Sequence, residues 1–179
     1  MKYMIASDLH GSAFYCKQLM EAMEREQPNR LVLLGDLLYH GPRNDLPKGY
    51  EPKEVIAMLN AKKDQLFCIR GNCDTEVDQM VLDFPILAES ALLLLDGQEI
   101  LAVHGHHPLP PVTKKMICWR GHSHVPFCGE QDGVFCMNPG SVSIPKENSP
   151  HSYMIWEEGK AVWKTLDGTV FLRWDGQKE

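Results

Sequence analysis

The chain has 179 residues and a formal net charge of −6, with 44% hydrophobic and 23% charged residues. This composition is that of an ordinary globular protein and excludes a disordered chain. The acidic balance argues against non-specific nucleic-acid binding, so no stable nucleic-acid partner is expected. The longest apolar run, residues 91–95, is too short to cross a bilayer. Polar residues from Ser7 onward interrupt any secretory signal, which predicts a cytoplasmic protein without a membrane partner.

The six cysteines form no Cys-x-x-Cys pair, and several lie inside apolar segments. In a cytoplasmic chain, this pattern favours reduced thiols over a disulfide framework or a structural zinc site.

Helices alternate with strands in the first half of the chain. Residues 2–7 and 30–34 read as short apolar strands, and Ser12 is a suitable N-cap for a helix that runs to about residue 27. Residues 54–63 form a second amphipathic helix, 65–69 another strand and 75–82 a short helix. Such alternation predicts parallel strands.

Strands dominate the second half. Residues 86–95 and 99–103 are expected to form a hairpin around the Asp96-Gly97 turn. Residues 117–120 and 134–137 read as further strands, and residues 153–156, 161–165 and 169–174 as three strands in the tail. At this length, with no linker or repeat, a single domain over residues 1–179 is expected.

Metal-ligand residues follow the apolar strands at five places. They are Asp8 and His10, Asp36, Asn72, His104, and the pair His122 and His124. Each alone has an ordinary interpretation as a cap or a satisfied histidine. Because the ends of parallel strands meet at one edge of a sheet, the five together favour a shared site.

Seven such ligands are too many for one tetrahedral zinc and suit two ions that share a carboxylate. The mixture of imidazole, carboxylate and amide favours manganese, iron, zinc or nickel over magnesium or calcium. Two divalent ions contribute +4, Asp8 and Asp36 contribute −2 and a hydroxide −1, which leaves about +1 to attract a phosphate.

The motifs Asp8-x-His10, Gly35-Asp36, Gly71-Asn72-x-Asp74, His104-Gly-His106 and Gly121-His122-x-His124, in this order, resemble the calcineurin-like metallophosphoesterases over residues 3–145. The stretches 40–44, 71–74 and 138–146 are closer still to a bacterial phosphodiesterase branch of that family. The resemblance implies one metallophosphoesterase domain over residues 1–179. Its expected fold is a four-layer αββα sandwich of two mixed β-sheets flanked by helices.

The resemblance also implies a ligand set and a reaction. One ion would be held by Asp8, His10, Asp36 and His124, and the other by Asp36, Asn72, His104 and His122, with Asp36 as the bridge. Manganese is the first expectation for both ions, with zinc, iron or nickel as alternatives. The implied activity is phosphodiester hydrolysis by attack of a metal-bridging hydroxide on a small substrate, without a covalent intermediate.

Cys73 stands where most of the family has a histidine, and Asp74 is the acid that follows it and orients that histidine in the family. The resemblance makes Cys73 a candidate catalytic residue and Asp74 a candidate supporting residue or acid. A thiol supplies no positive charge, which predicts a preference for diesters over dianionic monoesters. The alternative is that Cys73 only fills space in the turn. His106 and His107 are alternative acids, and Arg43 is a candidate phosphate contact or a solvated loop residue.

Two other functions stay open. One is a phosphomonoesterase or nucleotide phosphatase, and the other is a non-catalytic scaffold, since a retromer subunit shares this fold. A scaffold could lose its ligands freely, whereas this chain keeps all seven. A homodimer is expected only by analogy with relatives.

Overall fold

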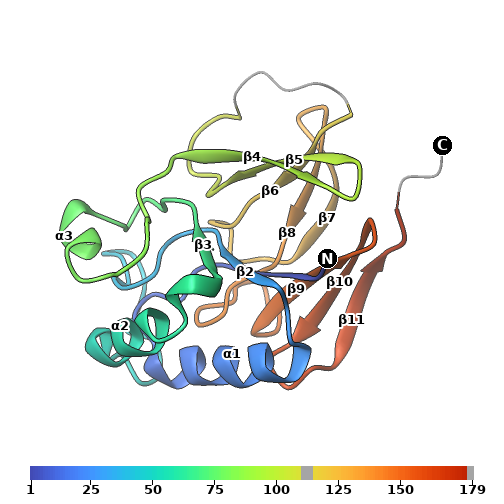
Figure 1. Ribbon diagram of the computed structural model, residues 1–179. Helices are drawn as coiled ribbons and strands as arrows, with labels where there is room; N and C mark the ends of the chain where they lie inside the picture. The colour runs from blue at the N-terminus through green and yellow to red at the C-terminus, as the bar shows by residue number, and fades with distance from the viewer. Residues whose placement is uncertain (110–114, 177–179) are drawn as a thin grey trace.

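Two mixed β-sheets lie face to face in the computed structural model, which describes residues 1–109 and 115–176 (Figure 1). The six-stranded sheet has the order β11 (Val170–Trp174), β10 (Lys160–Thr165), β9 (Ser152–Glu157), β1 (Tyr3–Ala6), β2 (Arg30–Leu33) and β3 (Leu66–Cys68). The five-stranded sheet has the order β4 (Ser90–Leu95), β5 (Gln98–Val103), β6 (Ile117–Trp119), β8 (Val134–Asn138) and β7 (Phe127–Gln131).

Parallel pairing occurs in both sheets. β1 pairs in parallel with β2, and β2 with β3. In the other sheet, β5 pairs in parallel with β6, and β6 with β8. The carboxyl ends of these strands, and the loops that follow them, therefore gather at one edge of the sandwich.

Two helices cover the outer face of the six-stranded sheet: α1 (Ala13–Glu26) and α2 (Pro52–Asn60) (Figure 1). The side chain of Ser12 caps α1 by accepting a hydrogen bond from Tyr15 N, as predicted. The buried stripe of α1 packs on Leu31 and Leu33 of β2 in one hydrophobic cluster. Two short helical turns, η1 (Lys63–Gln65) and α3 (Glu76–Gln79), complete the helical elements of the described residues.

The core between the sheets is rich in tryptophan. Trp119, Trp156 and Trp163 are fully buried there, and the rings of Trp119 and Trp156 meet edge to face at 5.6 Å. A smaller cluster on the outer face of the five-stranded sheet includes Leu101 and Cys118, with Met116 packed against it. The predicted sandwich of two mixed sheets is confirmed, and in the described residues all helices precede β4 in the chain.

The structure corrects two strand predictions. β7 was not predicted, although its hairpin with β8 turns at Asp132 and Gly133, which both have positive φ and form the type of turn that Asp-Gly sequences favour. The strand predicted over residues 86–95 begins only at Ser90. Ile86 packs in the cluster beneath α1, because residues 86–89 carry the chain from that layer to the five-stranded sheet. None of the helices in residues 1–109 and 115–176 has the length and apolar character of a membrane span.

Candidate metal centre

The structure brings all seven predicted ligand side chains to one edge of the sandwich. Asp8 and His10 follow β1, Asp36 follows β2, Asn72 follows β3, His104 follows β5, and His122 and His124 follow β6. Backbone hydrogen bonds join these loops. His10 N donates to Asp36 O at 2.9 Å, and Gly121 N donates to His104 O at 2.8 Å.

Backbone strain concentrates at this edge. Five of the seven residues have left-handed φ angles: Asp8 (60°), His10 (48°), Asp36 (57°), His122 (64°) and His124 (63°). Non-glycine residues rarely adopt this conformation, which costs about 1–3 kcal/mol per residue and clusters at functional sites. The strain therefore indicates that the fold holds these side chains in positions needed for binding.

Asp74 joins the loop after β3 to the loop after β2 through hydrogen bonds. Its carboxylate accepts N–H bonds from Gly71 (2.7 Å), Asp36 (2.8 Å) and Leu37 (2.9 Å). The two loops touch so closely that a Cβ on Gly71 would clash with the Asp36 carboxylate. Asp74 is 1% exposed and burial raises its pKa, despite the three N–H donors. It therefore holds the backbone of Asp36 in place and does not face the cavity.

Asp8, His10 and His124 form the buried half of the site, with side chains almost fully enclosed. The Nε2 atoms of His10 and His124 lie 3.5 and 3.3 Å from Asp8 Oδ1, and 3.3 Å from each other. Asp8 Oδ1 is buried without a hydrogen-bond partner. A buried carboxylate oxygen of this kind requires a cation or a donor.

The tautomers of the two histidines follow from their partners. His10 Nδ1 donates to Tyr39 O at 2.8 Å and His124 Nδ1 donates to Ile144 O at 2.6 Å, because carbonyls only accept. In the neutral rings, both Nε2 lone pairs then point at each other and at Asp8 Oδ1. This arrangement is repulsive alone and fits a divalent cation between the three atoms.

Asn72, His104 and His122 form the open half. Asn72 Oδ1 is 3.1 Å from His104 Nε2, and the rings of His104 and His122 are 5.1 Å apart. His104 Nδ1 donates to Leu34 O at 2.5 Å, which directs Nε2 toward Asn72 and Asp36. In this half, His122 is only half-buried and Asn72 is exposed.

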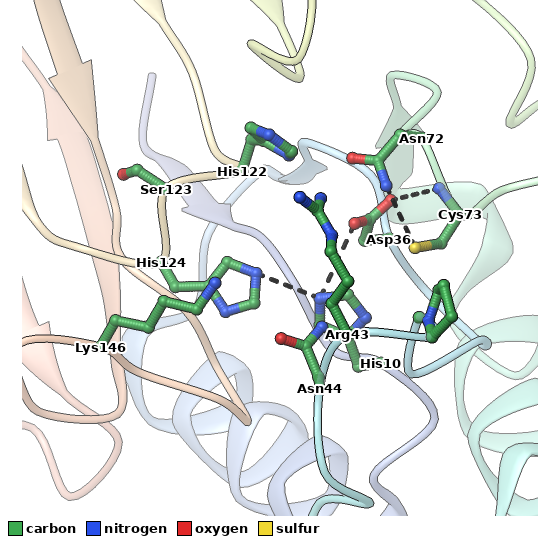
Figure 2. Close-up of a pocket in the computed structure, with 12 residues that line it drawn as sticks. His10, Asp36, Arg43, Asn44, Asn72, Cys73, His122, Ser123, His124 and Lys146 are labelled. Atoms are coloured by element: carbon green, nitrogen blue, oxygen red, sulfur yellow. Dashed lines mark hydrogen bonds and ion pairs between the residues drawn. The ribbon is translucent and has the colours of Figure 1, made fainter.

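Asp36 lies between the two halves. Its Oδ2 is 3.7 Å from His10 Nε2 and 3.4 Å from His104 Nε2, while its Oδ1 accepts the N–H of Cys73 at 2.8 Å (Figure 2). Asp36 with His104 and His122 forms a second group able to hold a cation. The donor set therefore fits two divalent ions, with the Asp36 carboxylate within reach of both.

Protonation shows how this donor set balances charge without a cation. Burial disfavours the charged form of Asp8, but the close imidazoles of His10 and His124, when protonated, lower its pKa well below the ordinary value. Burial also opposes protonation of His104, yet its bond with Asp36 and the charge of Asp8 raise the His104 pKa to about 9. For His122, burial and the charge of His104 lower the pKa to about 4. Without a cation, His104 is therefore protonated at neutral pH and His122 is not.

The sequence model of the calcineurin-like phosphoesterase superfamily domain matches residues 1–160. The chain belongs to this superfamily. It is 44% identical over 157 residues to the phosphodiesterase YfcE of Escherichia coli strain K12, covering 86% of this chain and 85% of YfcE. The solved structure of YfcE, described as a phosphoesterase, matches with a TM-score of 0.91 and 40% identity, covering 97% of this chain and 98% of that one.

One more distant relative of this calcineurin-like chain and one protein of the same fold were also found. The probable metallophosphoesterase YsnB of Bacillus subtilis strain 168 is 25% identical over 167 residues, covering 87% of this chain and 83% of YsnB. Vps29 of Entamoeba histolytica matches with a TM-score of 0.63 at 19% identity, covering 99% of this chain and 100% of that one, which shows a shared fold alone. The family prediction, its closer resemblance to YfcE and the phosphate-ester hydrolase class are thereby confirmed.

A cavity of about 400 Å³ opens over the centre of this calcineurin-like domain. Its lining includes the predicted residues Arg43 and Cys73 (Figure 2). Burial and the charge of Asp36 raise the pKa of the Cys73 thiol, so the thiol stays protonated and neutral. His106 and His107 do not line this cavity. They line a neighbouring cavity of about 170 Å³, and the ring of His106 is 6.1 Å from that of His122.

Several residues of the site were not predicted. Asn44, Ser123 and Lys146 also line the cavity, and Lys146 lies in the stretch 138–146 that carried part of the family resemblance. Ser141 and Ser143 donate to Asp8 O at 2.9 and 3.0 Å and so support the strained backbone there. Short polar loops of this kind give little sign of their partners in the sequence.

Proposed function

We propose that this protein hydrolyses phosphodiesters at a centre of two divalent ions, and that residues 1–179 form one metallophosphoesterase domain. The observation that carries the proposal is Asp36 Oδ2, which lies between His10 Nε2 and His104 Nε2 at 3.7 and 3.4 Å. The 44% identity to YfcE, a named phosphodiesterase, supports the same substrate class. Manganese is the first expectation for the metal, with zinc, iron or nickel as alternatives.

The chain would supply the ligands of both ions and hold them in the right orientation. One ion would be held by Asp8, His10 and His124, and the other by Asn72, His104 and His122. Asp36 would bind both ions. When bound, the two ions would lower the pKa of a water molecule and offset charge on the phosphoryl oxygens. The carbonyl partners of His10, His104 and His124 fix the rings with Nε2 toward the centre.

Cys73 sets the charge of the phosphate that the site prefers. A neutral thiol in the cavity adds no positive charge to stabilise the second negative charge of a monoester. We therefore propose a small diester as substrate, ahead of a monoester or a mononucleotide. A homodimer and a cytoplasmic location stay predictions.

The test is a hydrolysis assay on bis(p-nitrophenyl) phosphate after chelation and reconstitution with manganese. The expected result is activity that depends on metal and exceeds activity on p-nitrophenyl phosphate. Asp36→Asn should lower kcat/KM more than about 100-fold, since loss of even a supporting partner of a ligand costs about 10- to 100-fold. Asp64→Asn, an exposed carboxylate in η1, is the matched control and should keep full activity.

Equal activity of Asp36→Asn and the parent protein would contradict the proposal. A purified protein without bound metal and without hydrolysis of either ester would favour the scaffold alternative.

A further inference from the structure

Two basic side chains, Arg43 and Lys146, line the cavity that contains the metal centre. They come from loops far apart in the sequence, one after β2 and one after β8. Both are exposed residues, and both side chains point into the cavity (Figure 2). The cavity offers Asp36 as its only carboxylate among the described lining residues.

These two cations have no partner within the part of the chain that the structure describes. Five other basic residues there form ion pairs: Lys2 and Lys164 with Glu26, Lys62 with Glu24, Lys63 with Asp83, and Arg70 with Glu89. Further lysines without an ion pair to a described residue, such as Lys53 and Lys160, do not line this cavity. Arg43 and Lys146 form neither an ion pair nor a side-chain hydrogen bond with any described residue. In a chain with a net charge of −6, two free cations in one cavity indicate an anionic ligand.

The backbone positions both residues relative to the centre. Lys146 N donates to the carbonyl of His124 at 3.3 Å. The carbonyl of Lys146 in turn accepts a hydrogen bond from Ser149 Oγ at 2.6 Å. On the other loop, Asn44 Nδ2 donates to His40 O at 2.8 Å, which closes the turn that carries Arg43. The backbone of Lys146 is thus held next to His124, a proposed metal ligand, and Arg43 extends from a turn that a hydrogen bond closes.

A simple diester does not need the charges of Arg43 and Lys146 to balance its own. The occupied centre is expected to carry about +1, which a singly charged diester neutralises. We propose that Arg43 and Lys146 bind a second anionic group, so the substrates are phosphodiesters that carry an additional phosphate, such as a nucleotide diester with a terminal phosphate. This inference rests on the proposed function. A guanidinium and an ammonium both match phosphate oxygens, and about 400 Å³ is within the range of small-ligand sites.

The experiment compares thymidine 3′-(p-nitrophenyl phosphate) with its 5′-phosphorylated form, in the manganese-loaded protein. We expect kcat/KM to be about 10-fold higher for the phosphorylated form, as hydrogen bonds to charged groups are worth about this factor. Lys146→Gln and Arg43→Gln should each reduce that ratio several-fold. Lys160→Gln, which changes an exposed lysine at the start of β10, should leave the ratio unchanged.

A second readout does not depend on turnover. Calorimetry should show tighter binding of thymidine 3′,5′-bisphosphate than of thymidine 3′-phosphate, and Lys146→Gln should reduce the difference. Equal kcat/KM for the two diesters, or a ratio that neither variant changes, would overturn the inference and leave the proposed function intact. Faster hydrolysis of p-nitrophenyl phosphate than of either diester would also overturn it, because the cations would then serve a scissile monoester. If neither diester is hydrolysed, the proposed function fails, and the bisphosphate measurement still decides whether the two cations bind a second phosphate.

Discussion

The two halves of the candidate metal centre differ in exposure and in donor type. In the buried half, Asp8, His10 and His124 are 0%, 1% and 3% exposed. In the open half, His104 is also only 1% exposed, but Asn72 is exposed and contributes a neutral amide, and His122 is half-buried. Both halves reach the same carboxylate, Asp36.

The difference indicates separate tasks for the two ions. An unpartnered oxygen of Asp8 and two facing imidazole nitrogens make the buried half unfavourable without a cation, so it should bind its ion tightly. Both halves line the cavity, the buried half through His10 and His124 and the open half through Asn72 and His122. The ion of the open half should exchange more readily, because Asn72 and His122 are the more exposed ligands.

The largest expected effect is the difference between substitutions in the buried half and in the open half. His10→Ala should abolish binding of the tightly held ion and lower kcat/KM more than about 100-fold, whereas Asn72→Ala should weaken one ion about 10-fold and leave the other in place. Metal analysis after dialysis, together with kcat/KM at rising manganese concentrations, measures both effects. Recovery of Asn72→Ala at high manganese, without recovery of His10→Ala, is expected. Equal losses in the two variants would remove the distinction between the halves.

Within the open half, His104 and His122 differ in pKa. The His104 pKa of about 9 lies above the ordinary value of 6.5, so its proton stabilises the metal-free fold below pH 6.5 and that stabilisation is lost as pH rises through about 9. At pH 7.5 His104 must therefore release about one proton when metal binds, while His122, with a pKa of about 4, releases none.

Calorimetry of manganese binding in buffers of different ionisation enthalpy counts these protons. His104→Gln should release about one proton fewer than the parent protein, and His122→Gln should release the same number. Manganese affinity of the parent should rise with pH up to about 9. Identical proton counts in the two variants would show that the charge distribution differs from the one described.

The smallest expected effect concerns Cys73 at the cavity wall beside the open half. Cys73→His introduces a group that can carry positive charge, so activity on monoesters should rise several-fold relative to diesters. Paired assays on p-nitrophenyl phosphate and bis(p-nitrophenyl) phosphate give the ratio. Cys73→Ser, which stays neutral, is the control. An unchanged ratio in Cys73→His would mean that Cys73 only fills space.

The sequence was sufficient to predict that the seven proposed ligand side chains gather at one edge of the sandwich. Asp36 and His104 each follow an apolar strand directly, and parallel pairing brings such strand ends to one edge regardless of loop length. The sandwich fold was predicted from the family resemblance and from the alternation of helices with strands. Asp74 was a candidate supporting residue or acid, but its three N–H partners were not predictable, because they depend on the contact between two loops.

Other features depend on tertiary structure that the local pattern does not contain. His106 is two residues from His104 and lines the same neighbouring cavity, with its ring 5.4 Å from that of His104. The backbone turns at Gly105 with a φ of 102°, and His106 is not among the residues that line the main cavity. Lys146 is an exposed residue in a loop, where a charged side chain usually contacts only solvent. Only the position of this loop over the centre distinguishes it from other surface lysines.

The most direct test of the account is the number of metal ions per chain and their separation. Equilibrium dialysis with elemental analysis, followed by a crystal structure of the manganese-loaded protein with anomalous scattering, measures both. We expect two ions, one among Asp8, His10 and His124 and one among Asn72, His104 and His122, with the Asp36 carboxylate in contact with each. A single ion, or two ions without Asp36 between them, would contradict it.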